Sequence, residues 1–251
     1  MSARIEDRII ELLLEFKLAT VADELLPRLS GAGHGDAIET ILEVLELERE
    51  ARHERRVTRM RRASKLPSTK TFDTLNDKRF PRALMQKIKK LRTGDFLDEA
   101  ANILAFGLPG VGKSHVIAAL GHELIRAGRS VLWTPTYTLV QDLLAAKRDL
   151  ELPKKLRRLD HFDLVILDDI GYVKQSSEEA EVLFTLLAER YERRSTAITS
   201  NLVFSEWDRI FKNKMATSAA IDRLIHHSVV LEFNVESYRT EKAKTKRKPK
   251  N

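Results

Sequence analysis

The chain has 251 residues, 43% of them apolar, which is enough for one full α/β core and a smaller appended unit. It contains no cysteine, which excludes disulfides and thiolate metal sites. No apolar run reaches the length of a membrane span, and the start, MSARIEDR, lacks the apolar core of a signal peptide. We therefore expect a cytoplasmic protein with no membrane partner.

The formal net charge of +7 is unevenly distributed along the chain. Residues 49–65 carry eight Lys and Arg against two Glu, residues 147–158 carry six against two acids, and residues 239–251 carry seven against one Glu. The rest of the chain is net negative. Any one of these segments is also typical of a solvated helix face or a tail. The three together favour a polyanion partner, most simply nucleic acid.

The first third of the chain is predicted to be helical. Apolar residues at helical spacing predict a helix over residues 5–16 and a short second helix from residue 18 that ends near Pro27. Residues 31–35, GAGHG, predict a loop, and Asp36 is predicted to cap a long helix that runs to Arg62. We expect an all-helical N-terminal domain over residues 1–66, a linker over residues 67–82, and a helix over residues 82–94.

Strands and helices are predicted to alternate in the remainder. Five apolar runs predict strands at residues 102–106, 130–134, 164–168, 196–200 and 229–233, and helices are predicted at about 137–147, 177–193, 205–211 and 217–226. Alternation of this kind indicates an α/β fold with a parallel sheet. We expect this domain to span residues 83–238, with Trp133 and Trp207 in its core, followed by a basic tail over residues 239–251.

The most informative motif is GLPGVGKS at residues 107–114, which fits the phosphate-loop pattern G-x-x-x-x-G-K-[ST]. It lies between a predicted strand and a predicted helix, as a phosphate loop requires. Backbone N–H groups and the helix N-terminus would hold the phosphates of ATP or ADP, Lys113 would neutralise them, and Ser114 would ligate Mg²⁺. The expected nucleotide contacts are Gly107, Leu108, Pro109, Gly110, Val111, Gly112, Lys113, Ser114 and His115.

Polar residues end two of the later strands. The run LVILDD ends in Asp168 and Asp169, and buried carboxylates need a counter-charge, which a Mg²⁺ at the neighbouring phosphate site supplies. Asp168 is the candidate metal-side carboxylate, and Asp169 would orient or deprotonate the attacking water. Asn201 ends the next strand and would hold that water and sense the γ-phosphate, although an asparagine is also a common turn residue there.

Arg223 lies in AAIDRLIHH, on a predicted late helix. Such a residue cannot easily reach its own active site but could reach a neighbour's as an arginine finger, and it could also form a surface ion pair with Asp222. A finger would place ATP between subunits in a head-to-tail contact, which yields a ring or a helical filament. His226 and His227 are expected to be structural or partner-facing, because nothing else at ligand spacing accompanies them.

Several blocks carry a closer resemblance. GLPGVGKSHVIAALG, LVILDDIGY, LFTLLAERYERRSTAITSNLVFSEW, AAIDRLIHHSVVLEF and ESYR resemble successive blocks of the IstB-like transposition helper ATPases. That family belongs to the AAA+ class, near the DnaC helicase loaders and DnaA. The resemblance, over about residues 10–240, implies a three-layer AAA+ domain and an ATPase encoded by an insertion sequence. Such proteins assemble on duplex target DNA and recruit or stimulate a transposase.

The resemblance also assigns roles to matching residues. Lys113 and Ser114 carry over as nucleotide and Mg²⁺ residues, Asp168 and Asp169 as the acidic pair, and Asn201 as the polar sensor. Arg223 carries over as the finger, and Arg239 in SYR as a second nucleotide-sensing arginine.

The acidic pair departs from the family pattern at its second position. AAA+ ATPases usually have Glu where Asp169 stands, so the shorter side chain predicts slow basal hydrolysis. Three alternatives follow from the sequence: a helicase loader that binds single-stranded DNA, a switch protein that binds ATP but barely hydrolyses it, and a small-molecule kinase. The kinase reading is disfavoured, because a kinase does not need three basic segments.

The charge pattern favours contacts with the DNA backbone, which carry no direct sequence information. Binding should therefore be largely sequence-nonspecific and should weaken steeply with salt. The candidate DNA contacts are Lys147, Arg148, Lys154, Lys155, Arg157, Arg158 and Lys174.

Overall fold

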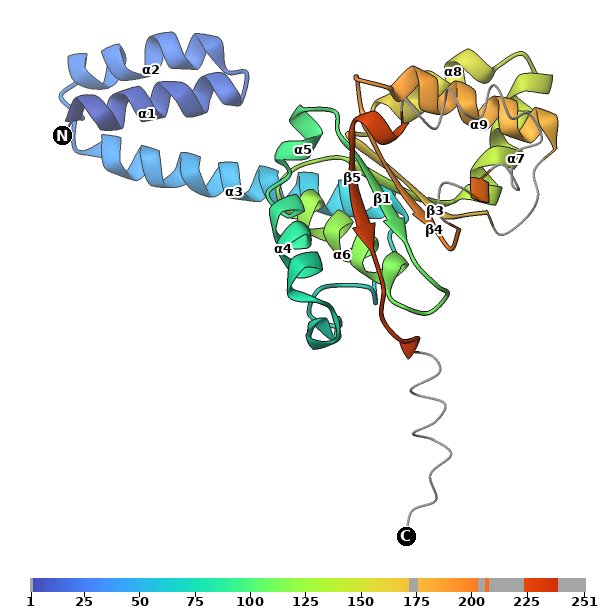
Figure 1. Ribbon diagram of the computed structural model, residues 1–251. Coiled ribbons are helices and arrows are strands. Elements are labelled where there is room, and N and C mark those ends of the chain that lie inside the picture. The colour runs from blue at the N-terminus through green and yellow to red at the C-terminus, as the bar shows by residue number, and fades with distance from the viewer. Residues whose placement is uncertain (1, 172–175, 203–205, 208–223, 239–251) are drawn as a thin grey trace. The chain divides into compact units, whose positions relative to one another are not determined.

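The computed structural model describes residues 2–171, 176–202, 206–207 and 224–238 (Figure 1). The chain forms two compact units, Met1–Arg59 and Met60–Asn251, and the boundary falls inside a long helix. Within the described residues, no helix is both long and apolar enough to cross a membrane. Most of the predicted helix over residues 205–211 and most of the one over 217–226 lie outside the described residues.

The first unit is built from α1 (Ser2–Glu15), α2 (Ala19–Gly31) and the first part of α3 (Ala37–Ser64). Its core contains buried Ile9, Leu13, Ala22, Leu26 and Ile38. The prediction that the second helix ends near Pro27 is wrong, because α2 continues through this proline to Gly31. A proline removes one backbone hydrogen bond, and Leu26, the residue before it, is buried in the core of this unit.

The second unit contains a five-stranded sheet in the order β2-β3-β4-β1-β5, with every neighbouring pair parallel. Its strands are β1 (Asn102–Phe106), β2 (Val131–Pro135), β3 (Leu164–Ile170), β4 (Ser195–Ser200) and β5 (Ser228–Glu232). Its helices are α4 (Arg82–Leu91), α5 (Asp95–Asp98), α6 (Lys113–Arg126), α7 (Thr136–Arg148), α8 (Leu152–Asp160) and α9 (Ser177–Arg190), preceded by a 3₁₀ turn at Asp77–Arg79. The predicted α/β fold with a five-stranded parallel sheet is confirmed.

Both faces of this sheet are covered, which explains why its strands are continuously apolar. Alternate residues of the strands, such as Leu104 and Leu167, join the core cluster formed with α7, α8 and α9. Ile166 points the other way and lies against α6 at Gly121. The three layers are visible in Figure 1. Trp133 and Trp207 are buried, as expected.

Two segments differ from their sequence-based description. Residues 152–160 were seen only as part of a basic run, yet they form α8, whose Leu152, Leu156 and Leu159 pack into the core. Residues 67–80, expected to belong to a linker, lie along α6, where Pro67 O is 3.1 Å from His122 Nε2. This segment ends at Phe80, which is buried and stacks edge-on against the Phe233 ring at 5.7 Å.

Candidate nucleotide site

The loop between β1 and α6 has the backbone of a phosphate cradle. Gly107, Gly110 and Gly112 have backbone φ angles of +149°, +82° and +108°, which residues other than glycine rarely adopt. A Cβ atom at Gly107 would lie 2.7 Å from the Phe233 carbonyl oxygen. The chain therefore needs glycine at residue 107 both for its conformation and for the close approach of the segment after β5.

Lys113 is held at this loop. It is buried, and its Nζ donates to the carbonyl oxygens of Gly107 at 2.6 Å and Leu108 at 3.0 Å. A strongly hydrated ammonium is stable in such a place only when carbonyls or anions satisfy it. The first helical turn of α6 thus presents a positive charge together with the helix N-terminus, and both attract phosphate.

A pocket of about 350 Å³ opens beside the loop. It brings together residues that are far apart in the sequence: Lys70, Thr74, Leu75, Asn76, Arg79, Phe80, Gly110, Val111, Gly112, Lys113, Ser114, His115, Asp168, Asp169 and Tyr238. The predicted loop residues and the predicted acidic pair thus share one pocket. Gly107, Leu108 and Pro109 belong to the loop but are not among the residues that line it.

The acidic pair ends the apolar part of β3, beside the loop. Asp168 is half-buried, and its Oδ1 accepts a hydrogen bond from Thr199 Oγ1 at 2.7 Å. Asp169 is exposed and has a φ of +65°, a left-handed conformation in which aspartate is much commoner than most residues. This conformation supplies a local reason for an aspartate at residue 169.

Asn201 directly follows β4, whose last residue, Ser200, accepts a hydrogen bond from the Gly107 N–H at 3.3 Å. Asn201 Oδ1 is buried and has no hydrogen-bond partner within the described part of the chain. A buried amide oxygen without a partner is costly, so its position beside the loop fits a residue that awaits a ligand or water. Asn201 does not line the pocket described above.

The structure adds site residues that sequence reasoning missed, from segment 67–80 and from the chain after β5. Thr74 Oγ1 lies 3.1 Å from His115 Nε2, which ties the segment to the loop helix. Arg79 lies over the Tyr238 ring at 5.2 Å, and the Tyr238 N–H donates to Gly110 O at 3.0 Å. The available signal was the isolated aromatic residue in NDKRF, within a run otherwise polar enough to resemble a linker.

The donor set of the site fits Mg²⁺. Ser114 and Asp168 both line the pocket, and Mg²⁺ usually takes one or two protein oxygens and completes its shell with water and phosphate. A metal site made of protein ligands alone would need a group of three or more His, Cys, Asp or Glu residues. The described ranges contain no such group. The predicted residues Lys174, Arg223 and Arg239 lie outside the described residues.

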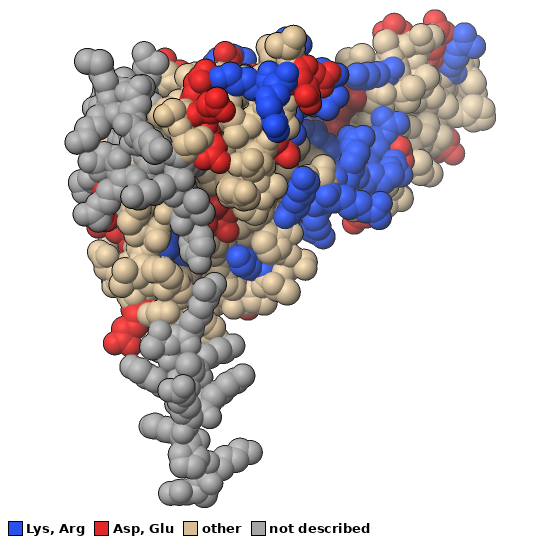
Figure 2. Space-filling model, turned by 90° about the vertical axis from the view of Figure 1, so that its right-hand side faces the viewer, with Lys and Arg blue, Asp and Glu red and all other residues tan. Residues whose placement is uncertain are grey.

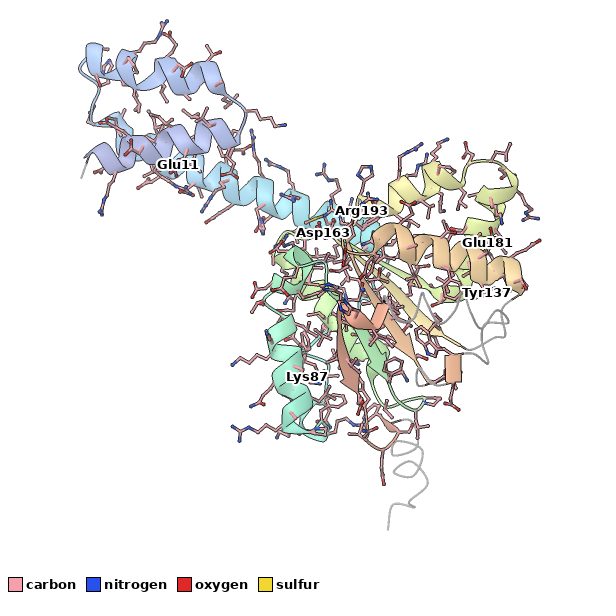
Figure 3. All side chains as sticks on the ribbon, turned by 45° about the horizontal axis from the view of Figure 1, so that its top comes forward. Glu11, Lys87, Tyr137, Asp163, Glu181 and Arg193 are labelled. Carbon is pink, nitrogen blue, oxygen red and sulfur yellow. The ribbon has the colours of Figure 1, made fainter. Side chains whose placement is uncertain are left out.

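Half of the described DNA-contact candidates are already engaged with acids on their own surface. Lys147 pairs with Glu181 at 2.7 Å, Lys155 with Asp142 at 3.0 Å, and Lys154 with Glu151 at 2.7 Å. Glu181 is labelled on α9 in Figure 3. Figure 2 shows an area where Lys and Arg alternate with Asp and Glu, and a second area that is mainly basic. The remaining candidates, Arg148, Arg157 and Arg158, are exposed.

Comparison with known proteins identifies the family of this chain. The model of the IstB-like ATP binding proteins matches residues 13–247. A Sinorhizobium fredii protein named an insertion sequence ATP-binding protein is 45% identical over 201 residues, which cover 80% of this chain and 67% of that protein. A protein of the insertion sequence IS5376 from Geobacillus stearothermophilus, also named ATP-binding, is 35% identical, with 80% of each chain covered.

Two solved structures show the same fold at low identity. The DnaC helicase loader aligns with a TM-score of 0.53 and 21% identity, over 61% of this chain and 89% of that one. AMPPCP-bound DnaA from Aquifex aeolicus aligns with a TM-score of 0.55 and 16% identity, over 75% of this chain and 58% of that one. The predicted AAA+ fold is confirmed.

Proposed function

This chain belongs to the IstB-like ATP-binding proteins of insertion sequences, and on that premise we propose what it does. It is a slow ATPase that assembles on duplex target DNA and recruits or stimulates a transposase. The observation that carries the proposal is the shared pocket of phosphate loop and acidic pair in a member of this family. The relatives' names favour transposition over the helicase-loader alternative, whose support is a likeness of fold.

We assign the parts of phosphoryl transfer to residues that line the pocket or lie beside it. Lys113 and the loop N–H groups would hold the β- and γ-phosphates and neutralise their charge. Ser114 and Asp168 would hold Mg²⁺, which supplies further charge neutralisation on the phosphate oxygens. Asp169, the more exposed carboxylate, would orient the attacking water and accept its proton. Asn201 would hold the same water from the end of β4.

Replacing Asp169 with asparagine is expected to lower the rate of ATP hydrolysis by about 100-fold while leaving ATP affinity within about twofold, because a general base acts in the transition state. Asparagine keeps the size and the tolerance of a positive φ. Phosphate release and equilibrium nucleotide binding measure the two effects. Rapid hydrolysis by the isolated protein that is unchanged in the variant would remove this role from Asp169.

Assembly would use the same nucleotide. Arg223 is the proposed finger that reaches the γ-phosphate of a neighbouring subunit, and Arg239 the second sensor. A head-to-tail contact of this kind repeats into a ring or a helical filament along DNA. ATP would then hold the assembly together, and slow hydrolysis would prolong it.

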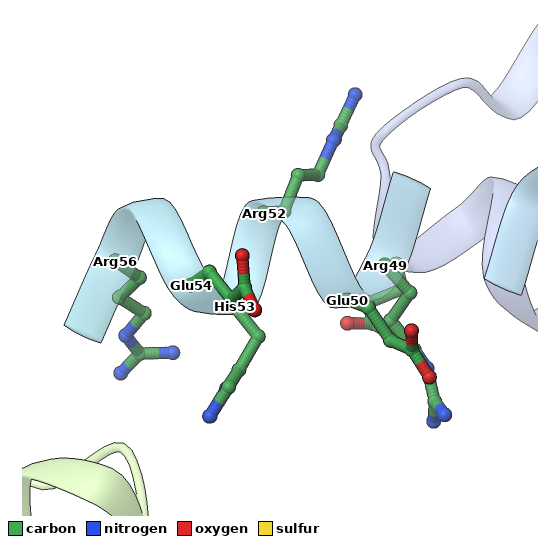
Figure 4. A pocket seen from close by; sticks show the side chains of 7 residues that line it. Arg49, Glu50, Arg52, His53, Glu54 and Arg56 are labelled. Carbon is green, nitrogen blue, oxygen red and sulfur yellow. The ribbon is translucent and has the colours of Figure 1, made fainter. Parts of the chain in front are cut away.

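The basic end of α3 adds a DNA-contact candidate. The first part of the basic run is compensated, since Arg49 pairs with Glu46, and Arg52 and Arg55 pair with Glu48. Arg52 and His53 also line a pocket whose other residues carry both positive and negative charges (Figure 4). From residue 56 to residue 72, by contrast, the sequence holds four Arg and two Lys but no Asp or Glu. Arg59, Arg61 and Arg62 are exposed on this stretch.

Neutralising Arg59, Arg61 and Arg62 to glutamine is expected to weaken duplex binding and to reduce the slope of log K against log salt by about 2–3, close to one per lost phosphate contact. Binding should be measured by anisotropy at several salt concentrations with ATP and Mg²⁺. The matched control neutralises Lys147, Lys154 and Lys155, which are already paired with acids, and should change the slope less. An unchanged slope in the arginine variant would move the DNA surface elsewhere.

A further inference from the structure

We propose that Thr199, a residue of β4 to which no role has been given, is a positioning residue that sets the direction of the Asp168 carboxylate and the backbone conformation of Asp169. The inference rests on the proposed ATPase function and concerns the same site. Thr199 is completely buried. Its hydroxyl donates to Asp168 Oδ1 at 2.7 Å and accepts from the backbone N–H of Asp169 at 2.8 Å.

An irregularity in the register between β3 and β4 explains why this hydroxyl is required. β3 and β4 pair regularly up to Leu167 and Ile198, but the next pair is Ile170 and Ser200. Two residues of β3 therefore oppose the single residue Thr199, which is the pattern of a β-bulge, rare between parallel strands. A bulge leaves backbone groups without their ladder partners. Thr199 Oγ1 takes the place of the missing carbonyl for the Asp169 N–H.

One hydroxyl thus serves two neighbouring acids in different ways. Because Oγ1 accepts from the Asp169 N–H, its only proton is available for Asp168 Oδ1. The first bond holds Asp169 in its left-handed conformation with the side chain exposed toward the pocket. The second bond leaves the other oxygen of Asp168 for a metal and fixes the plane of its carboxylate.

A second threonine, directly after the neighbouring strand β2, holds the same part of the chain. Thr136 Oγ1, at the start of α7, donates to the backbone oxygen of Asp168 at 3.0 Å. This bond acts on the backbone alone, so it can hold the end of β3 in place without directing either carboxylate. Thr199, by contrast, donates to a carboxylate oxygen of Asp168, so the orientation of that carboxylate depends on Thr199.

The test replaces Thr199 with valine, which keeps the branched shape and removes the hydroxyl, and with serine, which keeps the hydroxyl. Thr196→Val is the matched control, because Thr196 is a buried threonine at the other end of β4. Binding of a fluorescent ATP analogue is measured in EDTA and in rising Mg²⁺, alongside steady-state hydrolysis and thermal melting. Positioning residues around a metal typically affect metal affinity or activity by 10–100-fold.

We expect Thr199→Val to bind the analogue in EDTA within about twofold of the wild type, to need about tenfold more Mg²⁺, and to hydrolyse ATP at least tenfold more slowly. Thr199→Ser should restore most of both properties, and Thr196→Val should change neither. Wild-type Mg²⁺ dependence in Thr199→Val, or failure of serine to rescue, would overturn the proposal. If the wild type itself hydrolyses no ATP, the proposed function fails, while the Mg²⁺ dependence of binding still decides the role of Thr199.

Discussion

Replacing Lys113 with alanine is expected to reduce ATP affinity and hydrolysis together, the rate by about 10²–10³-fold, because the residue holds the one buried ammonium described at the loop. The variant loses the charge that meets the phosphates, and it also frees the carbonyls of Gly107 and Leu108 that Lys113 now binds. Nucleotide titration and phosphate release report the two losses.

A surface lysine provides the control for this change. Lys87 on α4 also donates to a backbone carbonyl, that of Val230 at 3.1 Å, but it lies outside the pocket lining (Figure 3). Lys87→Ala should bind and hydrolyse ATP as the wild type does. If Lys113→Ala keeps wild-type ATP affinity, the role given to Lys113 is wrong. If the variant loses ATP binding and still assembles on DNA, nucleotide control of the assembly is wrong.

Replacing Arg190 with methionine is expected to lower the free energy of unfolding by about 3–5 kcal/mol, because it removes the buried charged group of a network and leaves its acceptors unsatisfied. Arg190 is 1% exposed and donates to the carbonyl oxygens of Leu159 at 2.8 Å, Phe162 at 2.9 Å and Ser195 at 2.8 Å. These bonds join the ends of α8 and α9 to the start of β4. Burial lowers the pKa of Arg190 to about 10, against the opposing attraction of Asp160, so the guanidinium is still charged at neutral pH.

Urea unfolding of the full chain measures the loss of free energy. Thermal unfolding should show a fall in Tm of roughly 10 °C for a unit of this size. Arg193→Met is the control. It also pairs with Asp160, at 2.5 Å, but its side chain is 59% exposed, so its loss should cost less than about 1 kcal/mol. Arg193 is labelled in Figure 3. Equal destabilisation by both variants would contradict the conclusion that the buried bonds of Arg190 stabilise this unit.

The parts of this protein that sequence patterns predicted are those where one local rule dominates. The strand before the phosphate loop was placed at its observed bounds, Asn102–Phe106, because an apolar run met a glycine motif. The co-location of loop and acidic pair followed from the rule that parallel strands end at one edge of the sheet. By contrast, α8 was missed because four basic residues in it obscured leucines spaced by four and three.

Other features depended on contacts that no local pattern encodes. The bond of Thr199 to both acids arises from a slip in pairing between two strands, and a sequence does not display its register. The pocket wall from residues 70–80 was read as linker because Pro67, Pro81 and polar residues there are typical of one, whereas Phe80 is held by tertiary packing. Arg190 was read only as part of a helix, since its burial is set by distant carbonyls.

The bond from the Tyr238 N–H to Gly110 O bears on how the basic tail can be removed for study. A truncation that ends at Phe233 would also strip the phosphate loop of this bond and Arg79 of the aromatic ring beneath it. Loss of ATP binding in such a truncated chain would then report damage to the loop, whatever the tail contributes to DNA binding. A stop codon placed after Tyr238 separates these two effects, because it deletes the seven Lys and Arg of residues 239–251 and spares both contacts.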